Sequence, residues 1–209
     1  NYHNDFNLLQ SNNMIPDHFA IHSQKLIEIL SKSKFFNQEN FSLVESLRLQ
    51  NFSGVQKSTS PKSLIVLLDY DIKSSVNQIK LVLDFMKKYS FSNVKFKPHP
   101  TNYNRIRQLF KDIIFVNANI IDIVENYSHF FCSNNTTLSL ELINSGFNTA
   151  IMSSGKNLDM NPLKIYNIKK GIICDEDDLN QFLNTDANIH RNNLIYFDDK
   201  LSYWRNLLN

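Results

Sequence analysis

The sequence contains very little glycine. Its 209 residues include only four glycines, and neither Gly-x-Gly-x-x-Gly nor Gly-x-x-x-x-Gly-Lys-[Ser/Thr] occurs in it. Both motifs need glycine because the backbone must approach phosphates closely or take conformations that a β-carbon disfavours. We therefore expect neither a classical dinucleotide-binding domain nor a phosphate-loop NTPase.

Cysteine, long apolar runs and excess charge are also scarce. The two cysteines, Cys132 and Cys174, lie in apolar segments and are expected to be core residues in a reducing compartment. No His, Cys or carboxylate residues show paired metal-ligand spacing, so no metal or other cofactor is expected. No apolar run reaches the roughly 20 residues that cross a bilayer, which together with the lack of a visible signal peptide predicts a cytoplasmic protein. The net charge of +2 makes nucleic acid an unexpected partner.

Apolar and amphipathic segments alternate regularly after residue 61. The expected strands are 63–68, 94–97, 113–116, 130–132, 149–152 and 172–174. The expected helices are 76–89, 103–110, 120–127, 177–183 and a helix that begins near Thr136 and stops at Gly146. This alternation predicts an α/β fold with a Rossmann-like, doubly wound parallel sheet.

The residues before 61 show a weaker pattern, with strand candidates at 18–23 and 41–44 and a short helix over 24–32. We expect residues 1–60 to be a short N-terminal connecting segment that ends in a Ser-rich linker over 51–61. Residues 61–190 are expected to form the Rossmann-like domain, and residues 191–209 a C-terminal amphipathic helix. The sequence begins with Asn1 rather than Met, so we expect a fragment of a longer chain.

Ligands of doubly wound sheets bind at the carboxyl ends of the strands. Four polar turns are expected at that edge: Asp69–Tyr70–Asp71, Lys97–Pro98–His99–Pro100, Asn117–Ala118–Asn119 and Ser133–Asn134–Asn135–Thr136–Thr137. The acidic residues 175–178 fall at the same edge, but we expect them to cap the helix that follows.

His99 is the strongest single candidate for a functional role. It follows a strand and lies between two prolines that restrict its backbone, which predicts that the imidazole is held out at the ligand edge. A lone histidine is otherwise usually structural, and we expect that role for His129, which begins a strand at the opposite edge. An imidazole at the ligand edge can donate a hydrogen bond to a phosphate, and Lys97 can add charge.

Residues 130–146 form a strand, a polar loop and a helix in sequence order. Such a unit leaves free N–H groups at the helix start, where an anion is favoured, and Thr136 and Thr137 add hydroxyl groups. We interpret it as an anion-binding turn for a nucleotide phosphate. The alternative is a helix cap with no ligand at all.

These motifs resemble those of a known family. A strand ending in Lys97–Pro98–His99–Pro100, followed two strands later by Ser133–Thr137, Glu141 and Gly146, resembles the C-terminal donor-binding half of GT-B glycosyltransferases. It is most similar to the bacterial sialyltransferase, polysialyltransferase and Kdo-transferase group, which builds capsules and lipopolysaccharide. The resemblance implies an inverting glycosyltransferase that uses a nucleotide-activated sugar, preferably CMP-sialic acid-like or CMP-Kdo, in surface polysaccharide biosynthesis.

The resemblance also implies roles for individual residues. His99 and Pro100 would be the His-Pro motif, with His99 as the catalytic residue and Lys97 beside it. The second motif, which would hold the phosphate, comprises Ser133, Asn134, Asn135, Thr136 and Thr137. Glu141 would bind the ribose. Asp69, Asp71 and Asn117 are further candidate contacts at the edge.

In that group the acidic general base lies in an N-terminal Rossmann domain. No such domain precedes Asn1, so we expect this chain to be the donor half of a larger enzyme. The implied partners are a nucleotide-sugar donor and a glycan or glycolipid acceptor. The full-length enzyme could also associate peripherally with the inner face of the membrane.

Two other functions fit the same fold. One is the transfer of glycerol phosphate or ribitol phosphate from a CDP-linked donor, as in teichoic-acid polymerases, which also carry His-Pro turns. The other is a non-catalytic nucleotide-binding or assembly module. The identity of the donor would separate glycosyl transfer from polyol phosphate transfer, and the length of the full gene would separate the non-catalytic module from both.

Overall fold

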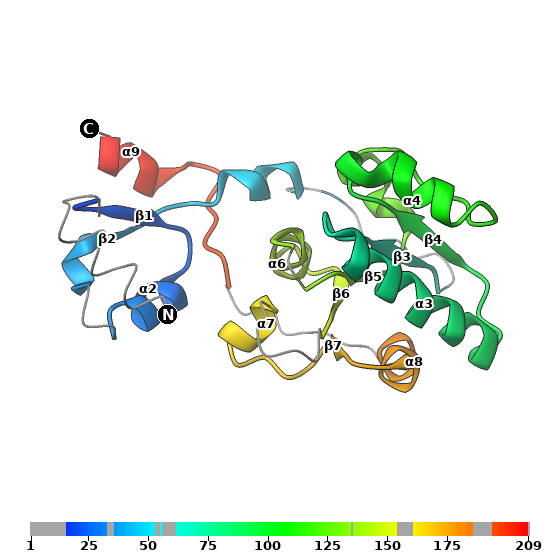
Figure 1. The fold of residues 1–209 in the computed structure, drawn as a ribbon. Coiled ribbons are helices and arrows are strands. Elements are labelled where there is room, and N and C mark those ends of the chain that lie inside the picture. The colour runs from blue at the N-terminus through cyan, green and yellow to red at the C-terminus, as the bar shows by residue number, and fades with distance from the viewer. Residues whose placement is uncertain are drawn as a thin grey trace. The chain divides into compact units, whose positions relative to one another are not determined.

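The structure is a computed structural model, and it describes residues 16–32, 36–52, 55, 62–134, 136–153, 161–185 and 194–208. Two compact units make up the chain (Figure 1). One contains residues 1–50 and 193–209, and the other contains residues 51–192.

The larger unit is built on a parallel sheet of five strands in the order β4-β3-β5-β6-β7. The strands are β3 (Leu64–Leu67), β4 (Val94–Lys97), β5 (His129–Cys132), β6 (Asn148–Met152) and β7 (Ile172–Ile173). Every residue of β3 and β5 is buried, as continuous strands in the middle of a parallel sheet require when helices cover both faces. The predicted α/β, Rossmann-like parallel sheet is confirmed.

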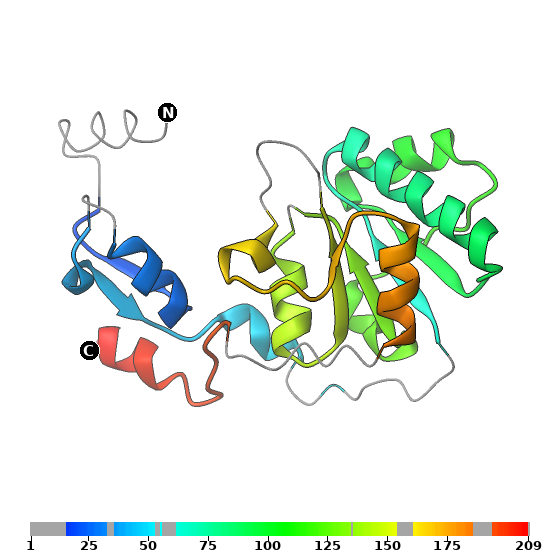
Figure 2. The same cartoon turned by 90° about the horizontal axis from the view of Figure 1, so that it is seen from below.

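Helices and 3-10 turns connect these strands. The α-helices of the larger unit are α3 (Ile72–Tyr89), α4 (Tyr103–Leu109), α5 (Ile120–Ile123), α6 (Leu138–Asn144), α7 (Pro162–Ile165) and α8 (Glu176–Asn184). Its 3-10 turns include η3 (Pro100–Asn102) and η4 (Val124–Asn126), and a further one, η2 (Leu47–Phe52), ends in it. The chain passes from β3 to β4 in one direction and from β5 to β6 in the other. Right-handed connections therefore place α3 and α6 on opposite faces of the sheet (Figure 2).

The core beneath α3 and α8 is apolar. Leu64, Val66 and Leu68 pack there with Phe131 of β5, and Ile79, Val82 and Phe85 of α3 cover them. Burying each such side chain is worth roughly 1.5–3 kcal/mol. This packing holds α3 against the sheet along most of its length.

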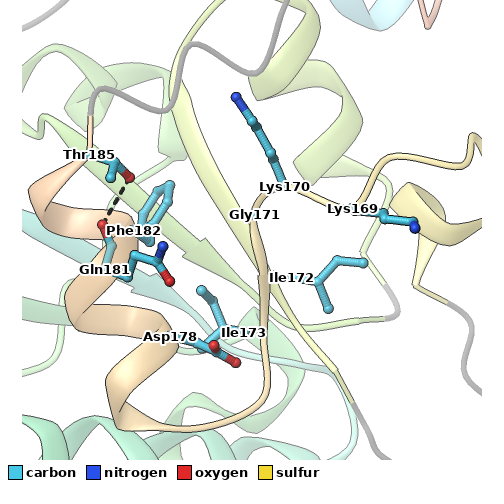
Figure 3. Close-up of a pocket in the computed structure, with 9 residues that line it drawn as sticks. All are labelled: Lys169, Lys170, Gly171, Ile172, Ile173, Asp178, Gln181, Phe182 and Thr185. Carbon is cyan, nitrogen blue, oxygen red and sulfur yellow. Dashed lines mark hydrogen bonds between the residues drawn. The ribbon is translucent and has the colours of Figure 1, made fainter.

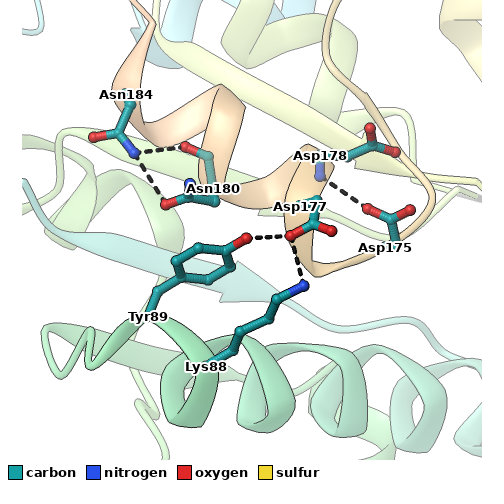
Figure 4. A network of polar contacts seen from close by, with 7 residues as sticks. All are labelled: Lys88, Tyr89, Asp175, Asp177, Asp178, Asn180 and Asn184. Carbon is teal, nitrogen blue, oxygen red and sulfur yellow. Dashed lines mark hydrogen bonds and ion pairs between the residues drawn. The ribbon is translucent and has the colours of Figure 1, made fainter.

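A polar contact joins the ends of α3 and α8 (Figure 4). The ammonium of Lys88 lies 2.6 Å from the Asp177 carboxylate, and the Tyr89 hydroxyl donates a hydrogen bond to the same oxygen. Asp175 caps α8 by accepting from the backbone N–H of Asp178 at 2.9 Å, so the predicted capping role of the acidic residues 175–178 is confirmed for Asp175. These groups are exposed, and they contribute to orientation more than to stability.

Four sequence predictions about this unit were inaccurate. The strand expected over 113–116 is reduced to one bridge between Phe115 and Phe96, because Ile114 is 71% exposed and the segment is not covered on both faces. The helix expected over 120–127 divides into α5 and η4. Helix α3 begins at Ile72 rather than at residue 76, since the Asp71 carboxylate caps it by accepting from Ser74 N–H at 2.8 Å. Cys174 is exposed rather than in the core, whereas Cys132 is fully buried.

The smaller unit contains a parallel pair of strands, β1 (Phe19–Ile21) and β2 (Phe41–Leu43). Between them lie α2 (Gln24–Leu30) and the 3-10 turn η1 (Gln38–Asn40). The rings of Phe19, Phe36 and Phe41 pack together at centroid distances of 5.3–5.7 Å. Most of the linker expected over 51–61 lies outside the described residues.

The C-terminal helix α9 (Ser202–Leu208) belongs to this smaller unit. Glu45 is buried and accepts hydrogen bonds from the backbone N–H groups of Tyr203 at 2.8 Å and Trp204 at 3.1 Å. The helix predicted over 191–209 is too long, because α9 begins only at Ser202. Leu201 has a φ of 51°, a left-handed conformation that ends the helix on its N-terminal side.

Candidate functional site

The carboxyl ends of the three strands β4, β3 and β5 lie level with one another. Leu67 is in register with Lys97 on one side and with Cys132 on the other. The chain leaves β3 towards β4 but later returns to pair β5 with the other edge of β3, so the strand order reverses between β3 and β5. Such a switch point is where open α/β sheets bind ligands, at the carboxyl edge. We therefore place the candidate site there.

The turn after β4 contributes two basic side chains. Lys97 is half-buried, and burial lowers the pKa of its ammonium group. His99 is exposed and caps η3, with its Nδ1 accepting a long 3.4 Å contact from Thr101 N–H. Because Nδ1 accepts, a neutral His99 carries its proton on Nε2. That N–H is a donor for an anion at the edge, and Pro100 begins the 3-10 turn behind it.

The turn after β5 is mostly buried where it begins. Ser133 is 2% exposed and Asn134 is also buried, whereas Thr136 is half-buried and Thr137 is exposed. Asn135 lies outside the described residues. Thr137 precedes α6 without a side-chain capping bond to it, and α6 has only seven residues. Thr136 and Thr137 are thus the described residues of this turn that are not buried.

Glu141 is 4% exposed and lies on α6 among buried neighbours. A glutamate on a helix is ordinarily solvated, and the burial of Glu141 in the first turn of α6 departs from this. Its burial is compatible with a ribose-binding role and equally with a structural one.

The two aspartates that follow β3, Asp69 and Asp71, both make hydrogen bonds within the turn that leads into α3. Asp69 is buried, and its carboxylate accepts a 3.0 Å hydrogen bond from Asp71 N–H. The hydrogen bond from Ser74 N–H to Asp71 lowers the pKa of the Asp71 carboxyl group. Asn117 is exposed and follows Val116, whose N–H donates to Phe96 O beyond the outer edge of β4. These three residues lie at or near the edge, but two of them already stabilise the turn that leads into α3.

Residues at the opposite edge have a different character. His129 is buried at the amino end of β5, where Nδ1 lies 2.9 Å from Ser128 Oγ and the ring packs edge-on against Phe182. This arrangement fits the structural role expected for His129.

The sequence predictions missed two polar side chains next to the site. Ser75 and Gln78 are fully buried on the face of α3 that covers the sheet. Their sequence signal is weak: Gln78 directly precedes Ile79, and Ser75 lies one turn earlier. A polar residue within an apolar helix face is the pattern that could have identified them.

A cavity of about 340 Å³ lies away from the switch point, between β7 and α8 (Figure 3). It is lined by Lys169, Lys170, Gly171, Ile172, Ile173, Asp178, Gln181, Phe182 and Thr185. None of the predicted site residues is among them. We favour the switch point over this cavity, because the strand-end turns converge there and the lysines of the cavity are simply exposed.

Metal and membrane sites were also sought in the structure. Among the residues that the structure describes, no three His, Cys, Asp or Glu side chains are grouped so that they could hold a metal ion. Within the same ranges no helix has the length and apolar character of a membrane span.

Comparisons with known proteins bear on the fold. No protein-family model matches the chain, and no curated protein sequence matches it. The S. aureus MnaA–UDP co-structure matches with a TM-score of 0.56 and 10% identity, over 91% of this chain and 58% of that chain. The structure of the wall teichoic acid polymerase TagF matches with a TM-score of 0.51 and 12% identity, over 90% of this chain and 52% of that chain. The crystal structure of accessory secretory protein 1, 2 and 3 in Streptococcus pneumoniae matches with a TM-score of 0.52 and 15% identity, over 97% of this chain and 40% of that chain.

The chain thus spans about half the length of the structures that it matches. At 10–15% identity the likeness establishes the fold, which these chains share with the α/β architecture described above. None of the three is named as a sialyltransferase or a Kdo-transferase.

Proposed function

We propose that this chain is the nucleotide-binding part of a glycosyltransferase-like enzyme that uses a nucleotide-activated donor. The observation that carries the proposal is the level ending of β4, β3 and β5 at the switch point. It brings the Lys97–His99 turn and the Ser133–Thr137 turn to one edge of the sheet. Basic groups and hydroxyls at such an edge suit a phosphate.

In this proposal the chain stabilises the leaving group. Breaking the bond between sugar and phosphate places negative charge on the departing phosphate oxygen. The Nε2–H of His99, the ammonium of Lys97 and the hydroxyls of Thr136 and Thr137 would offset that charge. An acceptor hydroxyl attacks the sugar carbon as a general base removes its proton, and we expect that base outside this chain. Glu141 would accept hydrogen bonds from the ribose hydroxyls.

The donor that we propose is CMP-linked, with sialic acid or Kdo as the sugar and a surface glycan or glycolipid as acceptor. The support is the sequence resemblance of the His-Pro and Ser/Thr-rich motifs. Calorimetric titration of the chain with CMP, CDP, UDP and GDP tests it. We expect CMP to bind more tightly than UDP or GDP. Tighter binding of UDP, the nucleotide named with MnaA, would refute the CMP assignment and leave the fold unaffected.

A second candidate is transfer of a polyol phosphate from a CDP-linked donor. The fold and the His-Pro turn suit both reactions. The likeness to the wall teichoic acid polymerase TagF is the observation that favours this one. CDP-glycerol is added to the same set of titrations, and binding of CDP-glycerol that is clearly tighter than binding of CMP would select this function. Binding of none of these nucleotides would favour a non-catalytic module.

A further inference from the structure

Three polar side chains are buried on the helix and strand that meet at the switch point: two belong to α3 and one directly follows β5. Ser75 and Gln78 are 0% exposed and Ser133 is 2% exposed. We call them the internal polar cluster. Buried polar atoms in native proteins nearly always have hydrogen-bond partners, so each atom of this cluster calls for one.

The orientation of the Gln78 carboxamide is determined by one contact. Its Nε2 donates to the carbonyl oxygen of Phe131 at 3.1 Å, and a carbonyl oxygen can accept only from the nitrogen side of the amide. The other end, Oε1, is buried and has no hydrogen-bond partner among the residues that the structure describes. The buried hydroxyl of Ser133 likewise has none within those ranges. One atom is an acceptor and the other is both donor and acceptor, so they are chemically complementary.

Strand register places Ser133 on the same side of the sheet as Gln78. Val66 pairs with Phe131, and both side chains belong to the core beneath α3. Side chains alternate along a strand, so Ser133, two residues after Phe131, also faces α3. Ser75 lies one turn before Gln78 on the same helix face and donates to the Asp69 carbonyl at 2.9 Å.

We propose that Gln78 is a positioning residue of the candidate site, linked to the Ser133 hydroxyl through one internal water molecule. The water donates one hydrogen to Gln78 Oε1 and the other to Ser75 Oγ, and it accepts the hydroxyl hydrogen of Ser133. Gln78 Oε1 and the Ser133 hydroxyl then each have a partner, and the water makes three hydrogen bonds, the usual number for a buried water.

This cluster connects the turns on the two sides of the switch point. Ser75 holds the Asp69 turn through its carbonyl, while Gln78 holds β5 at Phe131 and, through the water, at Ser133. The Ser133 hydroxyl is thus directed inward, and it sets where the 133–137 turn begins rather than touching the ligand. The functional half of this inference rests on the proposed nucleotide site.

The link itself can be tested without a ligand. The side-chain amide signals of Gln78 in a ¹H–¹⁵N NMR spectrum are assigned by their loss in Gln78→Met. We expect these signals to exchange slowly with solvent, and to shift in Ser133→Ala but not in Ile79→Val, a matched buried control on the same helix. Gln78 signals that are unchanged in Ser133→Ala would overturn the link.

Its effect on the site is tested by calorimetry with CMP and UDP on the intact chain. We expect Gln78→Met to raise the dissociation constant of whichever nucleotide the chain binds by about tenfold or more. The double variant Gln78→Met with Ser133→Ala should bind that nucleotide no more weakly than Gln78→Met alone. Ile79→Val should lower the melting temperature without changing affinity. The positioning role would be overturned if the affinity losses of the two single variants add up in the double variant, or if Gln78→Met leaves the affinity unchanged. If the unmodified chain binds none of CMP, CDP, UDP and GDP, the proposed function fails and the positioning role fails with it, and the NMR shift alone decides the link.

Discussion

His99 is the side chain whose exposure most directly supports a ligand role. It lies between Pro98 and Pro100 and is bonded only weakly to its own turn. We expect His99→Ala to weaken nucleotide binding by about 1–3 kcal/mol, the range for a hydrogen bond to a charged group. The melting temperature without ligand should hardly change, because the ring is exposed. Calorimetry and thermal unfolding measure the two effects.

A matched control is His18→Ala, which removes another exposed imidazole, in the smaller unit, where it contacts Ser42. That variant should bind nucleotide as the unmodified chain does. A sharp fall in the stability of His99→Ala with unchanged binding would make His99 a structural residue.

Glu141 lies on α6, the helix that follows the 133–137 turn, and is buried. We expect Glu141→Gln to lower affinity for ribonucleotides and largely abolish discrimination against the 2′-deoxy form, because an amide accepts fewer hydrogen bonds from the ribose than a carboxylate. The ratio of the ribo and deoxy dissociation constants measures this and is insensitive to a general loss of stability. A variant that discriminates as well as the unmodified chain would assign Glu141 a purely structural role.

At the scale of elements, Glu45 holds helix α9 in the smaller unit. Its carboxylate accepts from two N–H groups at the helix start, and its carbonyl accepts from the Trp204 indole at 2.8 Å. We expect Glu45→Ala to cost about 1 kcal/mol or more through loss of the cap. Helix α9 should separate from the unit, which shifts the fluorescence of the single tryptophan to longer wavelength.

The exposed Glu39 provides the comparison, since Glu39→Ala removes a carboxylate from η1 in the same unit. It should leave the fluorescence unchanged. An unshifted spectrum in Glu45→Ala would mean that side-chain packing alone retains α9.

Elements were predictable from the sequence where their pattern is self-contained. Strand β4 was predicted with its exact bounds, and the stop of α6 at Gly146 was correct, with Gly146 at a φ of 82°. The segment 113–116 is as apolar as a strand, yet only Phe115 pairs. Pairing depends on what covers the segment, and the sequence does not contain that information locally.

At the scale of the whole molecule, the reactivity of the two cysteines measures unfolding of the larger unit. Cys174 is exposed, whereas Cys132 is fully buried in β5 and burial raises the pKa of its thiol. We expect a thiol reagent at about pH 8 to modify one cysteine at once and the second only as the larger unit unfolds. Cys174→Ser should retain only the slow reaction. Rapid modification of both thiols in native buffer would contradict the burial of β5.

The sequence by itself determined where most strands and helices of the larger unit lie along the chain, and the identity of the turns at the carboxyl edge. Hydrophobic periodicity is local, so a strand such as β3 is visible in its own residues. The turn at Lys97–Pro100 could be located for the same reason, since it directly follows a strand.

Only the tertiary structure decided which of these turns stand side by side and which polar groups are buried. Strand order, strand register and the capping of α9 by Glu45 depend on contacts between residues distant in the sequence. The same holds for the burial of Glu141, Ser75 and Gln78. Each depends on which face of an element another element covers. Polar residues within an apolar pattern look alike in the sequence whether they face water or the core, and packing alone distinguishes the two.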